Sequence, residues 1–217
     1  MDTRGGEGQI HAMLDKLAAL LPRGARVLDI GAGRGENMVR LLESGLEVHG
    51  CDPDAAVAQR LRAEVGARYQ GACVFEREAK QVVDWAGNYD AVIFVKVLHL
   101  LERDAALELI EALARAMSAG AYLLLSSFLL PAVRTGLNST RAVSIDAWPC
   151  TIETGELAPF LLKQGLEPVF FGECMWDLES TGGPSQRAPR IKAYGTYLGR
   201  KTPGLDNGKD NEHGAAG

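Results

Sequence analysis

The sequence has 217 residues, enough for one domain with a sizeable core. Apolar residues make up 47% and charged residues 24%, as in an ordinary globular protein, and the net charge of −5 argues against nucleic-acid or membrane-surface partners, which reward a basic face. No apolar run is long enough to span a bilayer, the N-terminus lacks a signal-peptide core, and the four cysteines lack metal-finger spacing, so we expect a cytoplasmic protein with reduced thiols.

The first predicted element is an amphipathic helix, with apolar residues at helical spacing over residues 10–21. Short apolar strands and helices then alternate. Strands are predicted at "RVLDIG", "LEVHGCD", "ACVF", the start of "YDAVIFVKVLHLL" and "AYLLLSSFLL". Helices are predicted around residues 38–42, 57–65 and 107–117. Nearly continuous apolar strands that alternate with helices indicate an α/β fold around a buried parallel sheet.

The end of the chain breaks this alternation. A helix near residues 156–164 is followed by "EPVFFGECMW" and "IKAYGTYLGR", which lack a helix between them and are predicted to pair in antiparallel fashion. The prediction is therefore a single α/β domain over residues 1–201. Its Rossmann-like sheet has seven mostly parallel strands, an antiparallel last strand and helices on both faces. Residues 202–217, rich in Gly, Asn and Asp, are expected to form a disordered tail.

A glycine-rich stretch, "VLDIGAGRGENMVRLL", joins the first strand to the next helix at residues 27–42. Gly31, Gly33 and Gly35 permit a tight turn and a close approach of the backbone to a ligand. The carboxyl end of such a strand, beside the start of a helix, is where α/β sheets bind ligands. The alternative is a glycine-rich turn that only packs.

Two carboxylates indicate which ligand this stretch would hold. The G-x-G-x-G spacing differs from the dinucleotide fingerprint, and no lysine followed by Ser or Thr makes a P-loop. Asp29, two residues before the first glycine, would repel a pyrophosphate but suit a cation such as the α-amino group of a methionine moiety. Asp52, at the end of the second strand, would accept hydrogen bonds from two ribose hydroxyls.

The chain resembles the class I S-adenosylmethionine-dependent methyltransferases over residues 24–201, through "VLDIGAGRG", "VHGCD", "EREA", "NYDAVIFVKVLHLL" and "AMSAGAYLLLSS". The resemblance implies S-adenosylmethionine as cofactor and S-adenosylhomocysteine as product. It also implies a place for each matching residue. The methionine end would lie against Asp29, Gly31, Ala32 and Gly33, the ribose against Asp52, the adenine against Pro53, Glu78 and Ala79, and the transferred methyl near Val95 and Lys96.

The second half is similar to the tellurite-resistance methyltransferase subfamily, through "DAWPCTIETGELAPFLLKQGLEPV" and "RIKAYGTYLGRK". That subfamily is implied to methylate small soft nucleophiles, including chalcogen oxyanions. Arg190 matches its arginine at the start of the last strand, whereas the positions of its His-Arg pair fall near Glu179 and Ser180, so the pair is absent. A diverged relative that methylates another small molecule is the alternative.

The residues expected at the acceptor follow from the chemistry of methyl transfer, which needs alignment and, for a protonated nucleophile, a base. His99 and Arg190 are the candidate catalytic residues, and Lys96, Arg134, Trp148 and Arg190 the candidate substrate contacts. Residues 131–156 and 177–192 would form a basic cap over a small acceptor, either an anion or a soft S/Se/Te nucleophile. Each of three residues has an alternative role: His99 would pack structurally, Lys96 would point to solvent, and Trp148 would anchor the core.

Three function classes remain open. The first is a small-molecule methyltransferase, the second a catalytically silent S-adenosylmethionine-binding sensor or scaffold, and the third a nicotinamide-dependent oxidoreductase. The glycine spacing and Asp29 disfavour the third. The predicted partner is a small molecule, with no metal, nucleic acid or membrane involved, and the protein is expected to act as a monomer or homodimer.

Overall fold

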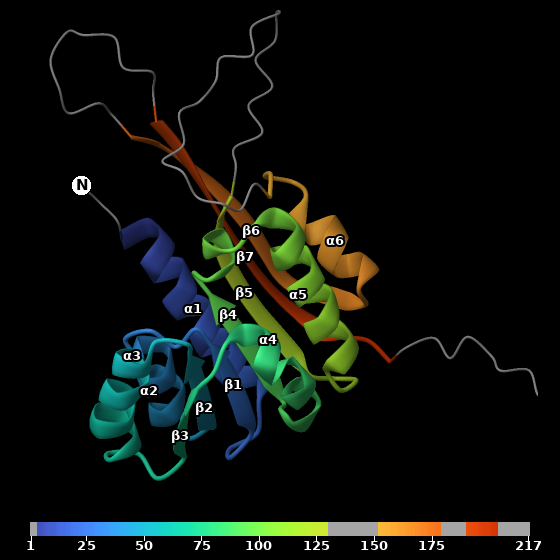
Figure 1. Cartoon of the computed structure of the whole chain (residues 1–217). Coiled ribbons are helices and arrows are strands. Elements are labelled where there is room, and N and C mark those ends of the chain that lie inside the picture. The colour runs from blue at the N-terminus through green and yellow to red at the C-terminus, as the bar shows by residue number, and fades with distance from the viewer. Residues whose placement is uncertain (1–3, 130–151, 179–189, 204–217) are drawn as a thin grey trace, which may run out of the picture.

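The computed structural model describes residues 4–129, 152–178 and 190–203. Figure 1 shows helices and strands that alternate along the first part of the chain. The helices are α1 (Arg4–Leu20), α2 (Glu36–Glu43), α3 (Ala55–Leu61), α4 (Ala79–Val82), α5 (Arg103–Ala116) and α6 (Leu157–Lys163). The strands are β1 (Arg26–Ile30), β2 (Glu47–Asp52), β3 (Ala72–Glu76), β4 (Ala91–Val95), β5 (Tyr122–Leu129), β6 (Leu166–Leu178) and β7 (Arg190–Lys201).

The seven strands form one sheet in the order β3-β2-β1-β4-β5-β7-β6. Neighbours among β1 to β5 pair in parallel, and β7 runs antiparallel to both β5 and β6. The predicted seven-stranded, mostly parallel sheet with an antiparallel last strand is therefore confirmed. The strand order reverses at β1, because β2 leaves it on one side and β4 on the other, and ligands of open α/β sheets bind at such a point.

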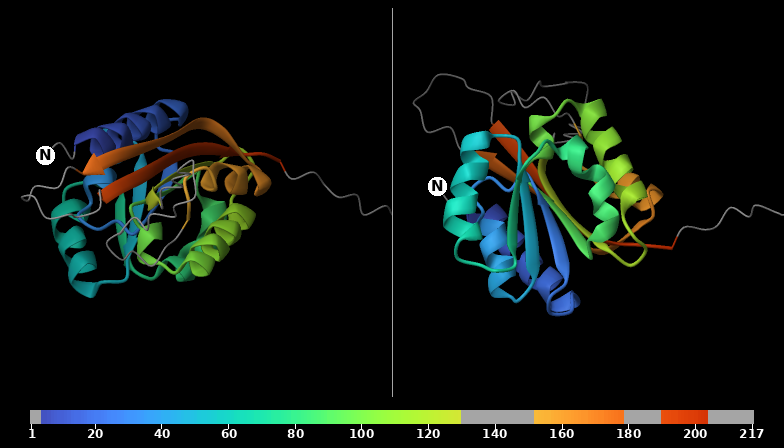
Figure 2. Two further views of the ribbon diagram at one scale, coloured as in Figure 1. Left: turned by 90° about the horizontal axis from the view of Figure 1, so that it is seen from above. Right: turned by 60° about the horizontal axis from the view of Figure 1, so that its bottom comes forward.

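Helices cover both faces of this sheet (Figure 2). Side chains of α1, α2 and α3 pack on one face, and those of α4, α5 and α6 pack on the other. The central strand β4 shows why its sequence is an unbroken apolar run. Ile93 and Val95 face the α1 side, Val92 and Phe94 face the α5 side, and all four are buried.

One crossover differs from the prediction, which placed no helix between β3 and β4. The structure has the short helix α4 there, followed by a 3-10 turn, Val83–Asn88. Glu78 precedes α4, and its N–H donates to the side-chain oxygen of Gln81 at 2.9 Å in a capping box. A four-residue helix spans barely one turn, so it leaves no repeating apolar period in the sequence to detect.

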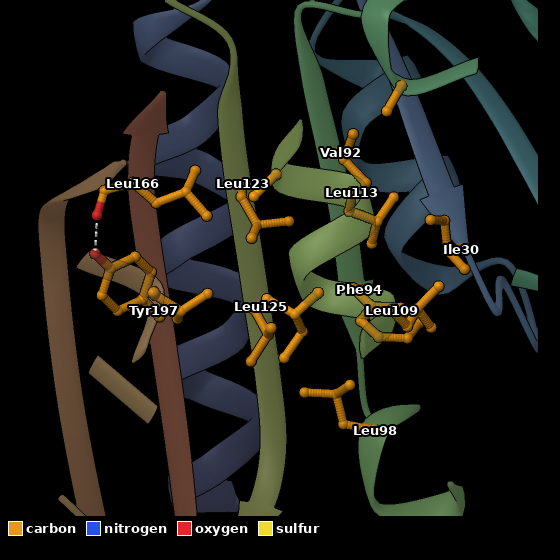
Figure 3. Packing of buried hydrophobic residues seen from close by; sticks show 14 of the residues in the cluster. Ile30, Val92, Phe94, Leu98, Leu109, Leu113, Leu123, Leu125, Leu166 and Tyr197 are labelled. Carbon is orange, nitrogen blue, oxygen red and sulfur yellow. Dashed lines mark hydrogen bonds between the residues drawn. The ribbon is translucent and has the colours of Figure 1, made fainter. Parts of the chain in front are cut away.

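The buried hydroxyl of Tyr197 in β7 offers a test of the packing on the α5 face of the sheet (Figure 3). It donates to the Leu166 carbonyl of β6 at 2.5 Å. We expect Tyr197→Phe to lower the free energy of unfolding by about 1–3 kcal/mol, because a buried hydrogen bond is lost. Urea unfolding measures the change, and Tyr69→Phe, which removes an exposed bond to Glu43, should cost less than about 0.5 kcal/mol. Equal costs for the two variants would contradict this packing.

Candidate active site

The glycine loop joins β1 to α2. Its three glycines share a left-handed backbone but differ in the contacts around them. All three adopt left-handed φ, at 74° for Gly31, 54° for Gly33 and 80° for Gly35. A Cβ atom would lie 2.4 Å from Val97 Cγ2 at Gly31 and 2.5 Å from Leu61 Cδ2 at Gly35. At Gly33 it would meet only a carbonyl oxygen at 3.8 Å. Gly31 and Gly35 are therefore fixed by packing, whereas the open space beside Gly33 suits a close approach by a ligand.

Hydrogen bonds hold this loop against the end of β2. The N–H groups of Gly31 and Ala32 donate to the Cys51 carbonyl at 2.8 and 2.9 Å. The N–H of Gly33 donates to Asp52 Oδ2 at 3.1 Å. The loop is thus shaped by the protein itself, and Gly31 and Ala32 already use their amide protons within it.

Asp29 lies in β1 between Gly50 of β2 and Ile93 of β4, on the face covered by α1 and α2. Its side chain is completely buried, and neither carboxylate oxygen has a hydrogen-bond partner among the residues that the structure describes. Burial, with a smaller contribution from Asp52, raises the pKa of Asp29 to about 7. A buried carboxylate without a partner is costly, so this position suits the positively charged group of a ligand.

Asp52 ends β2 and is half-buried. Its Oδ1 accepts the N–H of Asp54 at 3.0 Å, while Oδ2 accepts that of Gly33. Each oxygen keeps a further lone pair. Pro53 follows it at the surface. Asp52 therefore lies at the edge of the glycine loop with capacity for additional donors.

The predicted adenine residues lie beside Asp52. The N–H of Arg77 donates to the Asp52 carbonyl at 3.1 Å, which brings the start of α4 to this edge of the sheet. Ala79 is half-buried, whereas Glu78 is exposed, caps α4 and pairs with Lys80 at 3.0 Å. Part of the Glu78 carboxylate's bonding capacity is thus used within the protein.

The end of β4 turns sharply beside the glycine loop. Val95 is buried, and Lys96 has φ 57°, a value that a residue with a side chain rarely adopts. The N–H of Lys96 donates to the Ser126 carbonyl of β5 at 2.7 Å. Val97, which was not among the predicted site residues, supplies the side chain nearest Gly31. Strained backbone of this kind often accompanies functional sites.

His99 lies in the 3-10 turn Leu98–Leu100 and is only 5% exposed. Its ring stands edge-to-face with Phe128 at 5.0 Å, and Phe128 in turn with Tyr194 at 5.4 Å. Burial, and to a smaller extent Lys96, lower the pKa of His99 to about 4, so the imidazole is neutral at pH 7. We name His99, Phe128 and Tyr194 the aromatic row.

Phe128 and Tyr194, which lie opposite each other on β5 and β7, were not among the predicted site residues. Tyr194 is buried, and its hydroxyl is hydrogen-bonded to the Ser126 hydroxyl. The one available signal was an aromatic residue near the carboxyl end of a predicted strand. Their pairing depends on the register between two strands that are distant in sequence.

Other predicted residues lie outside the described parts of the chain. Arg134 and Trp148 fall there, as do residues 204–217 of the tail. Most of the two predicted cap segments, residues 131–151 and 179–189, falls there as well. Arg190 opens β7 opposite Leu178, but its side chain is not described.

Among the described residues, no group of three His, Cys, Asp or Glu side chains is arranged to hold a metal ion. None of the described helices has the length and apolar character needed to cross a membrane.

Two alanine substitutions test which glycine of the loop is fixed by packing and which has open space beside it. Gly31→Ala adds a clash with Val97 to an unfavourable φ, so we expect it to lower the free energy of unfolding by about 2–4 kcal/mol. Gly33→Ala meets open space and should cost only about 1–2 kcal/mol, through backbone strain. Urea unfolding of the ligand-free proteins measures both. A larger loss for Gly33→Ala would contradict the loop geometry.

Asp29→Asn tests the buried carboxylate through the pH dependence of stability. Because the folded-state pKa is raised from 3.8 to about 7, the protonated carboxyl favours folding below about pH 4, and this contribution is lost as the pH rises through 7. Asparagine does not ionise, so the variant should gain stability relative to the native protein, more at pH 8 than at pH 5. Chemical denaturation at both pH values measures the difference. An equal effect at the two pH values would show that Asp29 has an ordinary pKa.

Comparisons with known proteins identify the family of this chain. A family model described as a methyltransferase domain matches residues 5–169. YqeM of Bacillus subtilis (strain 168), which carries a provisional methyltransferase name, is 30% identical over 87 residues. That match covers 38% of this chain and 35% of YqeM, so it spans about a third of the curated relative.

Solved structures share the fold at low sequence identity. TehB from Haemophilus influenzae superposes with a TM-score of 0.66 at 20% identity, covering 88% of this chain and 62% of that chain. The 1,6-didemethyltoxoflavin-N1-methyltransferase of Burkholderia thailandensis, crystallised with 1,6-didemethyltoxoflavin and S-adenosylhomocysteine, gives a TM-score of 0.59 at 20% identity, covering 91% and 81%. These likenesses show the shared fold and do not confirm the resemblance to the tellurite-resistance subfamily. The family match spans most of the sequence, and the chain therefore belongs to the methyltransferase domain family.

Proposed function

We propose that this protein transfers the methyl group of S-adenosylmethionine to a small-molecule acceptor. The observation that carries the proposal is Asp29, a completely buried carboxylate beside the glycine loop with no hydrogen-bond partner among the described residues. The α-amino group of the methionine moiety would provide the missing positive charge. A dinucleotide pyrophosphate would instead add negative charge beside Asp29 and Asp52.

The remaining contacts proposed for the cofactor follow the same edge of the sheet. Asp52 would accept the ribose hydroxyls through the lone pairs that its two backbone donors leave. Pro53, Glu78 and Ala79 would flank the adenine. Gly33 would allow close approach of the backbone, and Val95 would contact the ligand near its sulfur. The bound cofactor supplies a methyl group already activated by its sulfonium charge.

The acceptor would lie beyond the carboxyl ends of β4 and β5 and the start of β7, against Lys96 and the aromatic row. In the transfer, a lone pair of the acceptor forms a bond to the methyl carbon while the carbon–sulfur bond breaks, which leaves S-adenosylhomocysteine. The protein must chiefly hold donor and acceptor in line. A histidine whose pKa is about 4 is a weak base at neutral pH. Its weak basicity favours acceptors that are already deprotonated, such as a thiolate or another soft anion.

The charged side chains proposed to contact the acceptor are basic. We propose Lys96 and Arg190 as contacts for an anionic acceptor, with Arg190 also stabilising charge during transfer, and Arg134 and Trp148 as contacts from the cap. A soft S, Se or Te nucleophile fits this set and the resemblance to the tellurite-resistance subfamily. We also propose cytoplasmic action as a monomer or homodimer, without nucleic acid, consistent with the net charge of −5.

An acceptor screen tests the function. Calorimetry should first detect S-adenosylhomocysteine binding, and a coupled assay should then detect its production from S-adenosylmethionine with thiols, selenite, tellurite, phenols and amines as acceptors. Turnover with any of them supports the proposal. Binding without turnover across an extended panel favours the silent cofactor-binding module. Binding of NAD but not of S-adenosylhomocysteine would overturn both.

Asp52→Ala removes the proposed ribose contact. We expect it to weaken S-adenosylhomocysteine binding by about 1–3 kcal/mol in calorimetry, because hydrogen bonds to a charged acceptor are lost. Glu43→Ala is a matched control, since Glu43 accepts a hydrogen bond from Tyr69 at the surface instead of contacting the loop. Normal affinity in Asp52→Ala would show that the cofactor site lies elsewhere.

His99 can be tested through the pH profile of kcat with an acceptor found in the screen. Because its pKa is about 4, the native enzyme should show no inflection from His99 between pH 6 and pH 8. His99→Gln should lower kcat roughly tenfold by disturbing the aromatic row, without changing the shape of the profile. An inflection near pH 6.5 that disappears in the variant would instead establish His99 as a general base.

A further inference from the structure

Arg60 in α3 closes a chain of hydrogen bonds around the glycine loop. Its Nη2 donates to the Gly33 carbonyl at 3.0 Å, while the Gly33 N–H donates to Asp52. Asp52 also accepts the N–H of Asp54, and Asp54 Oδ1 caps α3 by accepting the N–H of Ala56 at 2.8 Å. The chain therefore starts at the N–H of Gly33 and returns through α3 to its carbonyl.

The end of α3 and the turn after it also pack against the glycine loop. After Leu61 the helix continues as a π-helical turn, Arg62–Gly66. A Cβ atom at Gly35 would lie 2.5 Å from Leu61 Cδ2 and 3.2 Å from Val65 Cγ2, so both side chains pack closely on this glycine. π-turns of this kind are often found at functional sites. α3 thus contacts the loop at Gly35 by packing and at Gly33 through a charged side chain.

We propose that Arg60 is a positioning residue for the cofactor, acting through Gly33; the inference rests on the proposed function. Gly33 is the loop glycine with open space on its Cβ side, so packing does not fix its peptide groups. An anion on its N–H and a cation on its carbonyl hold these groups in one orientation. Without Arg60 the loop would have to be ordered when the cofactor binds, and that ordering reduces affinity.

The location of Arg60 predicts that binding changes while stability does not. Its side chain is 43% exposed, and its ion pair with Glu64 spans 4.0 Å at the surface. Exposed charge pairs contribute little to folding. A residue that only supports the fold would change the unfolding transition, whereas a positioning residue changes the affinity.

The test compares S-adenosylhomocysteine dissociation constants from calorimetry with melting temperatures of the ligand-free proteins. We expect Arg60→Met to raise the dissociation constant about three- to tenfold with a melting temperature within about 2 °C of the native protein. Arg60→Lys keeps a charged donor and should recover part of the loss. Two controls should stay within about twofold: Glu64→Gln, which removes the surface ion pair, and Arg68→Met, which removes an exposed cation stacked on Tyr69.

Three results would overturn the inference. The first is native affinity in Arg60→Met, and the second is an equal loss in Arg68→Met, which would indicate a general effect of charge. The third is a weakened Arg60→Met that Arg60→Lys does not improve. Failure of the native protein to bind S-adenosylhomocysteine would instead count against the proposed function, so the two failures are distinguishable.

Discussion

The candidate site depends most on one feature that is energetically unfavourable. This feature is the burial of the Asp29 carboxylate without a partner among the described residues. Taking a carboxylate out of water is costly unless another charge or donor compensates for it. Here the cost appears as a pKa of about 7, raised by burial and by Asp52. The surrounding fold keeps the carboxylate in place, because β1 lies inside the sheet between β2 and β4. A cationic ligand would convert this cost into binding energy.

Two regions at this edge of the sheet differ in their side chains, and each suits one of the two reactants, the methyl donor and the acceptor. Around β1 and β2 the side chains are acidic, and the glycine loop leaves space beside Gly33. Around β4, β5 and β7 they are aromatic, with Lys96 at the turn. An acidic end suits a donor that carries positive charge, and a neutral aromatic wall with a cation suits an acceptor that carries a lone pair or negative charge. Val97 joins the two regions by packing on Gly31.

The sequence allowed prediction of the features that local patterns encode. The unbroken apolar run of β4 indicated a strand covered on both faces, and the spacing of Asp29, the glycines and Asp52 located the candidate site. The short helix α4 was missed because four residues leave no periodicity. Phe128, Tyr194 and Arg60 were missed for another reason. Their contacts join residues far apart in the chain, and they exist only once register and helix packing are set.

Proton release on ligand binding tests the central role of Asp29 most directly. S-adenosylhomocysteine binding should be measured by calorimetry in buffers of different ionisation enthalpy, for the native protein and for Asp29→Asn. With a pKa of about 7, Asp29 is mostly protonated at pH 6.5 and must ionise to pair with the amino group, so the native protein should release at least about half a proton more than Asp29→Asn releases. This difference should shrink towards zero at pH 8.5. Equal proton release by the two proteins at pH 6.5, with equal affinity, would contradict the account.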